Sequence, residues 1–422
     1  MVAAPDDVIS ALDTEKAFST APKRILWVKV GGLWPLNTGG RLRSFHIISE
    51  LSRTHRVTVL TTHGPADDPE GLKAHLPNCT RVESFPYAAP KWNSPRFAAA
   101  LLRSWFSSLP VDLWKHRVAA LRAQTERLMA SGAVDLCVAD FLFAVPNVPL
   151  GGPVPVAFFA HNVEYMIWKR LADTKASWWQ RPLLEVEWRK IRRYEANAAR
   201  RADVTIAVSP ADRDLLADIA GKPGHAIPTG VDAAYFAPTG AAESPHHLVF
   251  TGSMDWHPND DAIHYFIETI LPAIRREIPS VTLSVVGRNP GAALQRVARE
   301  AGVEVTGTVD DVRPHIARAA VYVVPLRIGG GTRLKIFEAL AMAKAVVSTG
   351  IGAEGLPLVD GQDFLRADNP TEFARAVLSL LRDAERRRAL GQAGRQLVLE
   401  HYAWSRVARD FAVHCMQVDR QI

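Results

Sequence analysis

The chain has 422 residues, of which 48% are apolar and 22% are charged. This length allows two domains, each with a core of its own, and no stretch reaches the roughly 18–20 unbroken apolar residues of a membrane-spanning helix. The net charge of +6 favours anionic partners, but scattered arginines are more often solvated helix faces. Because no aromatic-basic motif of an RNA- or DNA-binding module occurs, no nucleic-acid partner is expected.

Cysteines and the first residues indicate the compartment. Cys79, Cys137 and Cys415 are widely spaced and form no C-x-x-C pair, so neither a disulfide framework nor a zinc site is expected. Residues 1–22 contain four acidic residues and no apolar h-region, which predicts a disordered leader rather than a signal peptide. A cytoplasmic location follows as an expectation.

The first β/α unit begins directly after this leader. Arg24–Val30 is a short apolar strand, a glycine-rich turn follows, a helix is expected over about 41–53, and Val57–Thr62 is a second strand. Strands that alternate with helices imply a parallel sheet, which binds ligands at the carboxyl ends of its strands. The glycines do not form G-x-G-x-x-G, so the pattern does not favour a nicotinamide cofactor.

Two stretches combine tryptophan with basic residues. The first lies at 91–117 and includes Trp92, Trp105 and Trp114, and the second lies at 168–193. Trp beside Lys and Arg is typical of a helix at the level of lipid headgroups. Ordinary packing of large aromatics beside basic helix faces is the alternative, and it is the favoured one.

Between these stretches lie two buried strands, Leu136–Ala139 and Val154–Phe159. The second delivers His161 to the carboxyl end of the sheet, where ligands are contacted. A single loop histidine is more often a structural hydrogen-bonding group, so its position makes it a candidate only. A helix over about 185–201 and the strand Val204–Val208 complete this half.

The composition shifts to Gly, Pro, Ala and Thr over residues 221–247, which predicts an interdomain linker. A second β/α series follows, with a helix at Asp260–Glu277, helices through 371–400 and a final helix that runs to Cys415. Its expected strands are Leu248–Gly252, Val281–Val286, Val303–Val305, Val321–Leu326 and Ala345–Ser348. Two α/β halves with a ligand cleft between them are therefore expected.

The segment 325–355 contains the strongest chemical signal. A strand stops at a glycine triplet, and a helix follows with Arg333, Lys335 and Glu338. Amide donors, a helix N-terminus and two cations suit a diphosphate, and a carboxylate one turn later suits a ribose diol. A nucleotide sugar satisfies both demands. The alternative is an exposed Lys–Glu pair beside a structural turn.

Taken in order, these segments resemble the retaining glycosyltransferases of the GT-B fold, family 4, and most closely the branch associated with bacterial exopolysaccharide synthesis. The resemblance covers roughly residues 24–415. It is carried by HNVE at 161–164, EANAARRADVTIAVSP at 195–210, FTGSMDWHPN at 250–259, VVGRNP at 285–290, VTGTVDDVRP at 305–314 and the 325–355 block.

The resemblance implies two Rossmann-like, doubly wound parallel-sheet domains that face each other across a cleft, with a final helix that crosses back to the N-terminal domain. The N-terminal domain would bind the acceptor and the C-terminal domain the nucleotide sugar. The implied boundaries are 23–220, a linker at 221–247, 248–400 and a crossover helix at 401–422.

The resemblance also implies roles for individual residues. Catalysis and donor contacts would involve His161, Arg333, Lys335 and Glu338. The donor would also be lined by Gly252, Ser253, Thr308, Val309, Gly329, Gly330, Gly331 and Thr332. A loop toward the acceptor and phosphates would hold Gly39, Gly40, Arg41, Arg43, Asn162 and Glu164. Gly330 stands where the family has a first glutamate, and Gly252–Asp260 lacks the customary Arg and Lys, which Arg333 and Lys335 would replace.

The expected activity is metal-independent transfer of a sugar, with retention and same-face attack, from a nucleoside diphosphate sugar to a glycan or lipid-linked acceptor. Neither a metal nor a cofactor is expected. Contact with an anionic membrane at the cytoplasmic face of the inner membrane is a further expectation. Two alternatives remain: a nucleotide-sugar epimerase or hydrolase of the same fold, and a scaffold subunit that binds sugar nucleotides without turnover.

Overall fold

The computed structural model describes residues 21–90, 94–174, 181–328 and 334–416. The chain forms two compact units. The first comprises the residues up to Pro228 together with those from Val407 onward, and the second runs from Thr229 to Arg406. The predicted leader lies outside the described residues up to position 20.

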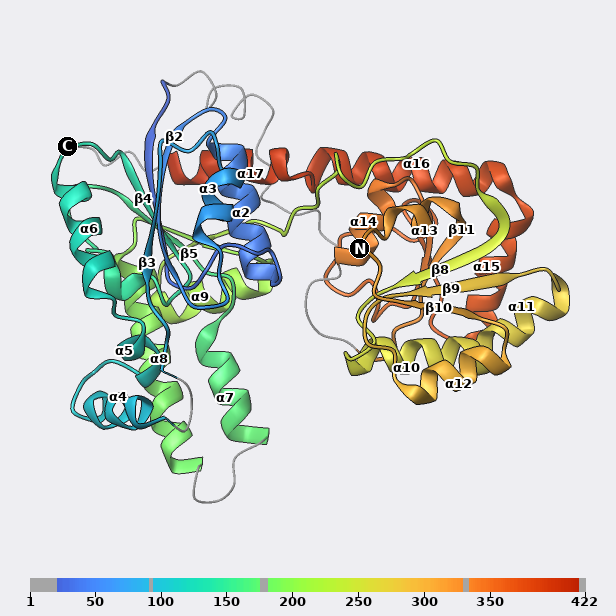
Figure 1. Ribbon diagram of the computed structural model, residues 1–422, viewed down its shortest axis with the longest axis horizontal. Coiled ribbons are helices and arrows are strands. Elements are labelled where there is room, and N and C mark those ends of the chain that lie inside the picture. Colours follow the sequence, from blue (N-terminus) through green and yellow to red (C-terminus); the bar gives the residue numbers. More distant parts are fainter. Residues whose placement is uncertain (1–20, 91–93, 175–180, 329–333, 417–422) are drawn as a thin grey trace. The chain divides into compact units, whose positions relative to one another are not determined.

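The first unit is built on a seven-stranded parallel sheet in the order β3-β2-β1-β4-β5-β6-β7 (Figure 1). Its strands are β1 (Arg24–Lys29), β2 (Arg56–His63), β3 (Arg81–Pro86), β4 (Leu136–Asp140), β5 (Val156–Phe159), β6 (Val204–Ala207) and β7 (His225–Ala226). Its helices are α2 (Gly39–Leu51), α3 (Pro69–His75), α4 (Pro95–Trp105), α5 (Val111–Lys115), α6 (Ala119–Ala130), α7 (Glu164–Thr174), α8 (Arg181–Arg201) and α9 (Pro210–Ala220). The central strands β4, β5 and β6 are buried along their whole length, as a parallel sheet covered on both faces requires.

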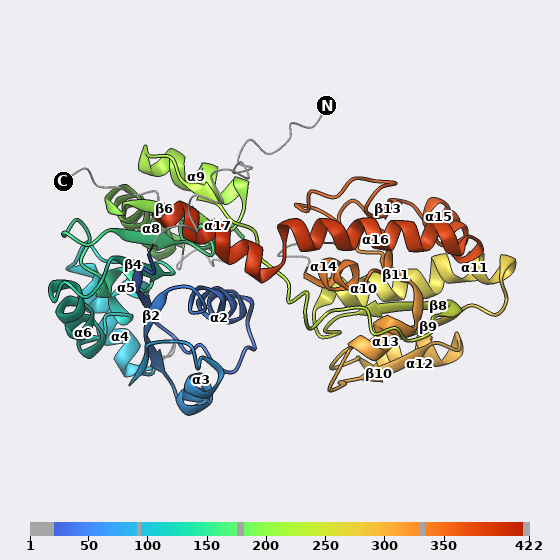
Figure 2. The same ribbon diagram turned by 90° about the horizontal axis from the view of Figure 1, so that it is seen from above.

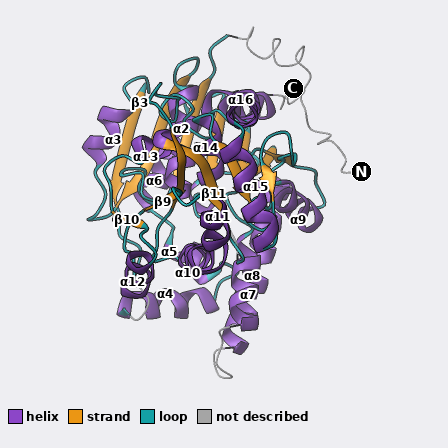
Figure 3. Ribbon diagram, turned by 90° about the vertical axis from the view of Figure 1, so that its right-hand side faces the viewer, coloured by secondary structure: helices purple, strands orange, loops and turns teal. Residues whose placement is uncertain are grey.

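The second unit has a six-stranded parallel sheet in the order β10-β9-β8-β11-β12-β13. Its strands are β8 (Ser244–Thr251), β9 (Thr282–Val286), β10 (Glu304–Gly307), β11 (Ala319–Val324), β12 (Ala345–Ser348) and β13 (Leu365–Arg366). Its helices are α10 (His257–Tyr265), α11 (Leu271–Glu277), α12 (Ala292–Glu300), α13 (Arg313–Arg318), α14 (Leu334–Ala341), α15 (Pro370–Arg382), α16 (Ala384–His401) and the start of α17 (Trp404–Met416). Figures 1 and 3 show α16 on one side of this sheet and α10 and α12 on the other.

Both sheets share one topological feature that decides where ligands bind. In each, the chain first builds strands outward in one direction and then returns to the opposite side of its first strand, so the switch falls between β1 and β4 and between β8 and β11. Doubly wound sheets bind ligands in the crevice outside the carboxyl ends of the strands at such a switch. The predicted architecture of two doubly wound units is confirmed.

The last helix belongs mainly to the first unit. Phe411 of α17 is buried and packs against Trp27 of β1 and Phe159 of β5, with ring centroids 5.5 and 5.0 Å apart. His414 stacks on His225 of β7 at 3.9 Å. Figure 2 shows α17 beside the strands of the first unit. The expectation that the final helix crosses back to the N-terminal domain is confirmed.

Several boundaries differ from those expected. The segment 221–247 is not one linker, because β7 at its start joins the first sheet and β8 begins at Ser244, four residues before the predicted strand. The helix predicted over 260–277 is α10 and α11 joined by a π-helical turn, Phe266–Ile270. The predicted loop Gly39–Arg43 is the first turn of α2, where the Thr38 side chain accepts a hydrogen bond from the Arg41 amide; this cap begins the helix before Arg41.

Candidate active site

A cavity of about 520 Å³ lies wholly within the second unit, at the carboxyl ends of β8 and β11. It brings together six of the predicted residues: Gly252, Ser253, Thr308, Val309, Lys335 and Glu338. The lining is completed by Phe236, Thr251, Trp256, Asn259, Val286, Gly287, Arg288, Val312, Leu326 and Leu334. The cavity therefore sits at the switch point of the sheet, where the topology predicts a ligand site.

Two glycines shape this cavity. Gly252 has φ +155°, and a Cβ there would lie 2.6 Å from Asn259 Nδ2 and 2.8 Å from Lys335 Nζ. Gly287 has φ +157°, and its Cβ would lie 1.7 Å from the Gly252 carbonyl oxygen. Both the backbone conformation and the contact distances exclude a side chain. The turns after β8 and β9 can therefore touch, which leaves their backbone open toward the cavity.

Lys335 places an ammonium group against these turns. Its Nζ donates a 2.7 Å hydrogen bond to Asn259 Oδ1 and lies 4.2 Å from the centroid of the Phe250 ring. Asn259 in turn donates from Nδ2 to the Ser253 carbonyl at 2.8 Å. These contacts hold the charge of Lys335 beside the Gly252–Ser253 backbone, where an anionic ligand would meet it.

Glu338 follows one helical turn later and lines the same cavity. Burial raises the pKa of Glu338 to about 7, against the opposing effect of the nearby Lys335 charge. A carboxyl group with a perturbed pKa in a cavity is typical of a functional site. At neutral pH this group is divided between its ionised and protonated forms.

The remaining predicted donor residues are Gly329, Gly330, Gly331, Thr332 and Arg333. They lie outside the described residues, so the amide and arginine contacts expected of them stay predictions.

Beside the cavity, the structure shows polar residues for which no role was predicted, and one of them, Arg288, lines it. Arg288 Nε donates to Ser253 Oγ at 2.6 Å, and Asn289 Nδ2 donates to Asp255 Oδ2 at 3.0 Å. Ser253 Oγ itself donates to Asp255 Oδ1, so a polar network joins the turns after β8 and β9. In the sequence, these residues lie in two of the segments that carry the family resemblance, 250–259 and 285–290. Only the adjacency of β8 and β9 shows that these segments meet.

The first unit carries a second cluster at its own switch point. Lys29 ends β1 and Asp140 ends β4, and the two are direct partners in the sheet. Lys29 Nζ lies 3.1 Å from Asp140 Oδ2, which also accepts a 2.8 Å hydrogen bond from Trp27 Nε1. His161, just beyond β5, has its Nε2 2.8 Å from Asp140 Oδ1. The sequence identified only the histidine of this group.

His161 is thoroughly packed. It is 4% exposed and stacks on Phe141 with ring centroids 3.8 Å apart. Burial lowers the pKa of His161 to about 3 despite the adjacent carboxylate, so the imidazole is neutral at physiological pH. Burial alone would raise the pKa of Asp140, but the charge of Lys29 and the contact with His161 hold it below its usual range.

Helix α2 reaches this cluster through a glycine and an arginine. A Cβ on Gly40 would lie 2.7 Å from Phe141 Cζ, so only glycine lets α2 approach so closely. Arg43 is buried, its Nη1 lies 3.4 Å from His161 Nδ1, and burial lowers its pKa to about 10. Arg41 instead pairs with Asp67 at 2.6 Å. A Cβ on Gly39 would meet open space.

The predicted residues Asn162 and Glu164 flank the start of α7. Asn162 is exposed, and its Nδ2 donates to Glu164 Oε1 at 3.4 Å. Burial raises the pKa of Glu164 to about 6. The backbone amides of Glu164 and Tyr165 donate to Glu195 of α8 at 2.9 and 3.0 Å, which fixes the orientation of the 161–164 segment.

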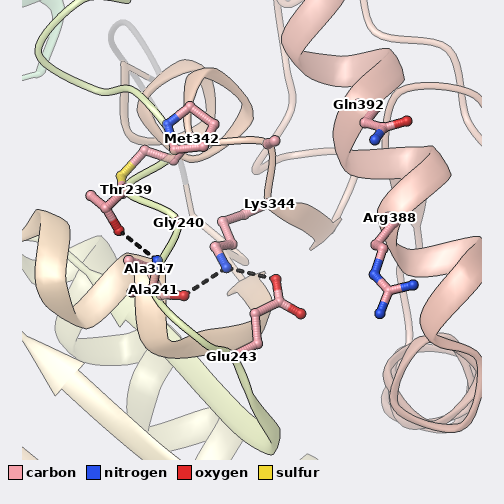
Figure 4. A pocket seen from close by; sticks show the side chains of 11 residues that line it. Thr239, Gly240, Ala241, Glu243, Ala317, Met342, Lys344, Arg388 and Gln392 are labelled. Atoms are coloured by element: carbon pink, nitrogen blue, oxygen red, sulfur yellow. Dashed lines mark hydrogen bonds and ion pairs between the residues drawn. The ribbon is translucent and has the colours of Figure 1, made fainter.

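A smaller cavity of about 200 Å³ in the second unit has a structural explanation (Figure 4). Lys344 Nζ donates to Glu243 Oε1 and to the carbonyl oxygens of Ala317 and Ala319, at 2.7–2.9 Å. Glu243 also accepts from Arg387 at 3.2 Å. Lys344 and Glu243 thus join the segment before β8 to β12 and, through Arg387, to α16, while Arg388 also lines the cavity.

Two kinds of feature are absent from the described part of the chain. None of its helices is both long enough and apolar enough to cross a membrane. It also contains no group of three His, Cys, Asp or Glu side chains arranged to hold a metal ion.

Two doubly wound parallel-sheet units in one chain are the architecture of the GT-B fold. Comparison with solved structures agrees: the Anabaena protein Alr3699/HepE in complex with UDP superposes with a TM-score of 0.59 at 15% identity, over 92% of this chain and 98% of that chain. Residues 39–235 match the family described as Glycosyltransferase Family 4, and residues 245–383 match Glycosyl transferases group 1. The chain therefore has the GT-B fold, and each of its two units matches a glycosyltransferase family model.

Two curated relatives are informative. The GDP-mannose-dependent alpha-(1-6)-phosphatidylinositol monomannoside mannosyltransferase of Mycolicibacterium smegmatis is 29% identical over 48% of this chain. The match spans 59% of that relative's length. A Klebsiella pneumoniae protein, described as an uncharacterized 44.6 kDa protein in the cps region, is 20% identical over 84% of this chain and 90% of its own length.

Proposed function

We propose that the protein transfers a sugar from a nucleoside diphosphate sugar to a glycan or lipid-linked glycan acceptor. The observation that carries this proposal is the second unit's cavity, in which Lys335, the Gly252–Ser253 turn and Glu338 meet at the switch point. An ammonium and open backbone suit a diphosphate, and a carboxyl group one turn further suits ribose hydroxyls. The matches to two glycosyltransferase families and to the mannosyltransferase relative support a sugar as the transferred group.

In this proposal each donor residue has a defined task. Glu338 accepts hydrogen bonds from the ribose hydroxyls, and Lys335 binds the diphosphate together with Arg333 and the amides of 329–332. Thr308 and Val309 lie near the base. In the first unit, His161 contacts the transferred sugar, and the segment from Asn162 to Glu164 and the start of α2 serve the acceptor. Because His161 is buried and neutral and its Nε2 faces Asp140, a hydrogen bond to the sugar would have to replace the contact between Nδ1 and Arg43.

The chemistry we propose is same-face transfer with retention and without a metal. The bond between the anomeric carbon and the β-phosphate oxygen breaks, while the acceptor oxygen forms a bond to that carbon on the same face. The acceptor proton passes to the departing phosphate oxygen. Negative charge grows on the β-phosphate, and preorganised cations and amides directed at such charge lower a barrier by several kcal/mol. Bacterial polysaccharide synthesis is the context we propose, supported by the relative in the cps region.

The test begins with donor binding, measured as thermal stabilisation by UDP, GDP, ADP, TDP and their sugars. A ligand at about 100 times its Kd stabilises the folded protein by about 2.7 kcal/mol. One nucleotide class should stabilise the wild type, and Glu338→Gln should lose most of that effect. Glu385→Gln, which changes an exposed carboxylate on α16, is the matched control. If Glu338→Gln responds as the wild type does, the ribose role is wrong.

Turnover then separates the competing activities. Incubation of the bound donor with membrane extracts should give a glycosylated product, in which NMR finds the anomeric configuration of the donor. Activity should survive chelation of divalent metals. Free sugar as the main product with acceptor present would favour a hydrolase, an isomerised donor would favour an epimerase, and binding without turnover would favour a scaffold subunit.

A further inference from the structure

Helix α4 of the first unit is apolar on two faces. Its inner face, with Phe97, Ala100 and Ser104, is buried. On the outer face Leu102 and Trp105 are 55% and 54% exposed, and Phe106, the residue after the helix, is 87% exposed. Positions 102, 105 and 106 share one side of a helix. Large apolar side chains gathered on one exposed face indicate a surface that meets another apolar phase.

The outer face is held in place by the packing behind it. Lys190 of α8 donates from Nζ to both the carbonyl oxygen and Oγ of Ser104, at 2.8 and 3.0 Å. Phe97 belongs to the core of the first unit and is 6% exposed. Rotation of α4 to bury Trp105 would break these contacts. The exposed aromatics are therefore a fixed feature of this unit.

The charge around this face is positive. Helix α4 contains no Asp or Glu, and Arg103 is exposed, three positions before Phe106 and therefore on an adjacent part of the helix surface. Helix α8, which Lys190 ties to α4, has seven Lys and Arg residues but only three glutamates. Two of these, Glu187 and Glu195, are buried. Figures 1 and 3 show α4 at the same end of the unit as the C-terminal end of α7 and the N-terminal end of α8.

We propose that the α4 patch, defined as Leu102, Arg103, Trp105 and Phe106, docks on an anionic lipid surface. Aromatic side chains on a basic amphipathic helix lie at the boundary between headgroups and acyl chains, and nearby Lys and Arg are attracted to anionic headgroups. A second copy of this chain fits less well. Two α4 patches packed symmetrically would bring arginines together without any acidic side chain from the helix.

This docking goes beyond the proposed transfer reaction and does not rest on it. The patch lies entirely in the first unit, whereas the donor cavity lies entirely in the second. If the acceptor is lipid-linked, docking would place the first unit at the surface where that acceptor resides. The two proposals can therefore succeed or fail separately.

The test is co-sedimentation of the full chain with vesicles of phosphatidylcholine alone or mixed with phosphatidylglycerol. Trp105→Ser/Phe106→Ser removes the aromatics, and Arg103→Glu reverses the charge. The matched controls change exposed residues of the second unit: Val359→Ser, at 53% exposure, and Arg375→Glu on α15. The wild type should bind only the anionic vesicles. The aromatic double variant should bind these vesicles at least about tenfold more weakly than the wild type. Arg103→Glu should bind them at least about fivefold more weakly. Both control variants should bind them as the wild type does.

Two outcomes would overturn the proposal. One is that anionic vesicles bring down no wild-type protein, or bring down the double variant equally well. The other is a wild-type dimer in sedimentation equilibrium that the double variant loses, since the patch would then be an interface between copies. Thermal stabilisation by the donor nucleotide, measured on the same variants, should be unchanged, which separates a failure of docking from a failure of the proposed activity.

Discussion

At the scale of single residues, burial sets the protonation states of both candidate sites. Glu338 and His161 are both shifted by burial toward their neutral forms, but the consequences differ. The pKa of Glu338 comes to lie near neutrality, whereas that of His161 falls to about 3. Glu338 can therefore change its charge under working conditions, while His161 stays a neutral hydrogen-bonding group.

Donor binding should accordingly depend on pH through Glu338. Ribose hydroxyls bind more strongly to the carboxylate than to the protonated carboxyl group, so below a pKa of about 7 the affinity should fall by up to about tenfold for each pH unit, and above it the affinity should level off. Isothermal titration with the nucleotide sugar is the measurement, because its diphosphate does not titrate near neutrality. Glu338→Gln should bind weakly at every pH. A wild-type affinity that stays constant through neutral pH would contradict the role of Glu338.

At the scale of elements, the start of α7 depends on a carboxyl group from another helix. Glu195 of α8 accepts from the amides of Glu164 and Tyr165, which are first-turn donors that the helix itself cannot satisfy. Burial raises the pKa of Glu195 to about 8, and the neighbouring Glu164 adds to the effect. The segment that carries His161 is therefore followed by a helix N-terminus that is capped by Glu195, and the charge of this capping group depends on pH.

The stability of the first unit should therefore fall as pH rises toward 8. The pKa of Glu195 is higher in the folded state than in the unfolded one, so its contribution is complete below the ordinary glutamate pKa and is lost as pH rises through the folded value. Relative to Glu195→Gln, the wild type should lose on the order of 4–5 kcal/mol of unfolding free energy across this range. Denaturant titrations at several pH values measure this. Glu70→Gln, an exposed carboxylate of α3, should track the wild type, and parallel curves for Glu195→Gln would contradict the linkage.

At the scale of the whole molecule, the chain leaves the first unit and returns to it. Val407, Phe411 and Cys415 of α17 are all buried, and Phe411 packs on β1 and β5. The first unit therefore completes its core only when the end of the chain is present, although most of its sequence precedes Thr229. The second unit contains the donor cavity without this segment.

A chain that ends at Arg406 should have a destabilised first unit. Loss of Phe411 alone removes a buried aromatic side chain, a change that typically costs about 3–5 kcal/mol. Calorimetry should show the first unit melting at a lower temperature, while donor nucleotide still stabilises the second. A chain that ends at Met416 is the control. If both shortened chains melt alike, the packing of α17 does not contribute as the structure indicates.

Much of this organisation follows from local sequence patterns. Short, continuous apolar runs predicted β1, β4, β5, β11 and β12 to within one or two residues, because strands buried on both faces leave no polar alternation. The edge strand β3 was missed because its sequence, RVESFP, is only partly apolar and its residues are partly exposed. The two-residue strands β7 and β13 are too short to carry a pattern.

Local patterns in the amino-acid sequence predicted the alternation of strands and helices, and they identified Lys335 and Glu338, because residues one helical turn apart share a face whatever surrounds them. The sequence also supplied the glycines that the turns after β8 and β9 require. The meeting of Lys29, Asp140 and His161 depends on the folded sheet, since strand order is not a local property and β1 pairs with a strand 111 residues away. In the same way, packing decided which face of α4 is buried and left Trp105 and Phe106 exposed, because both faces of that helix are apolar in sequence.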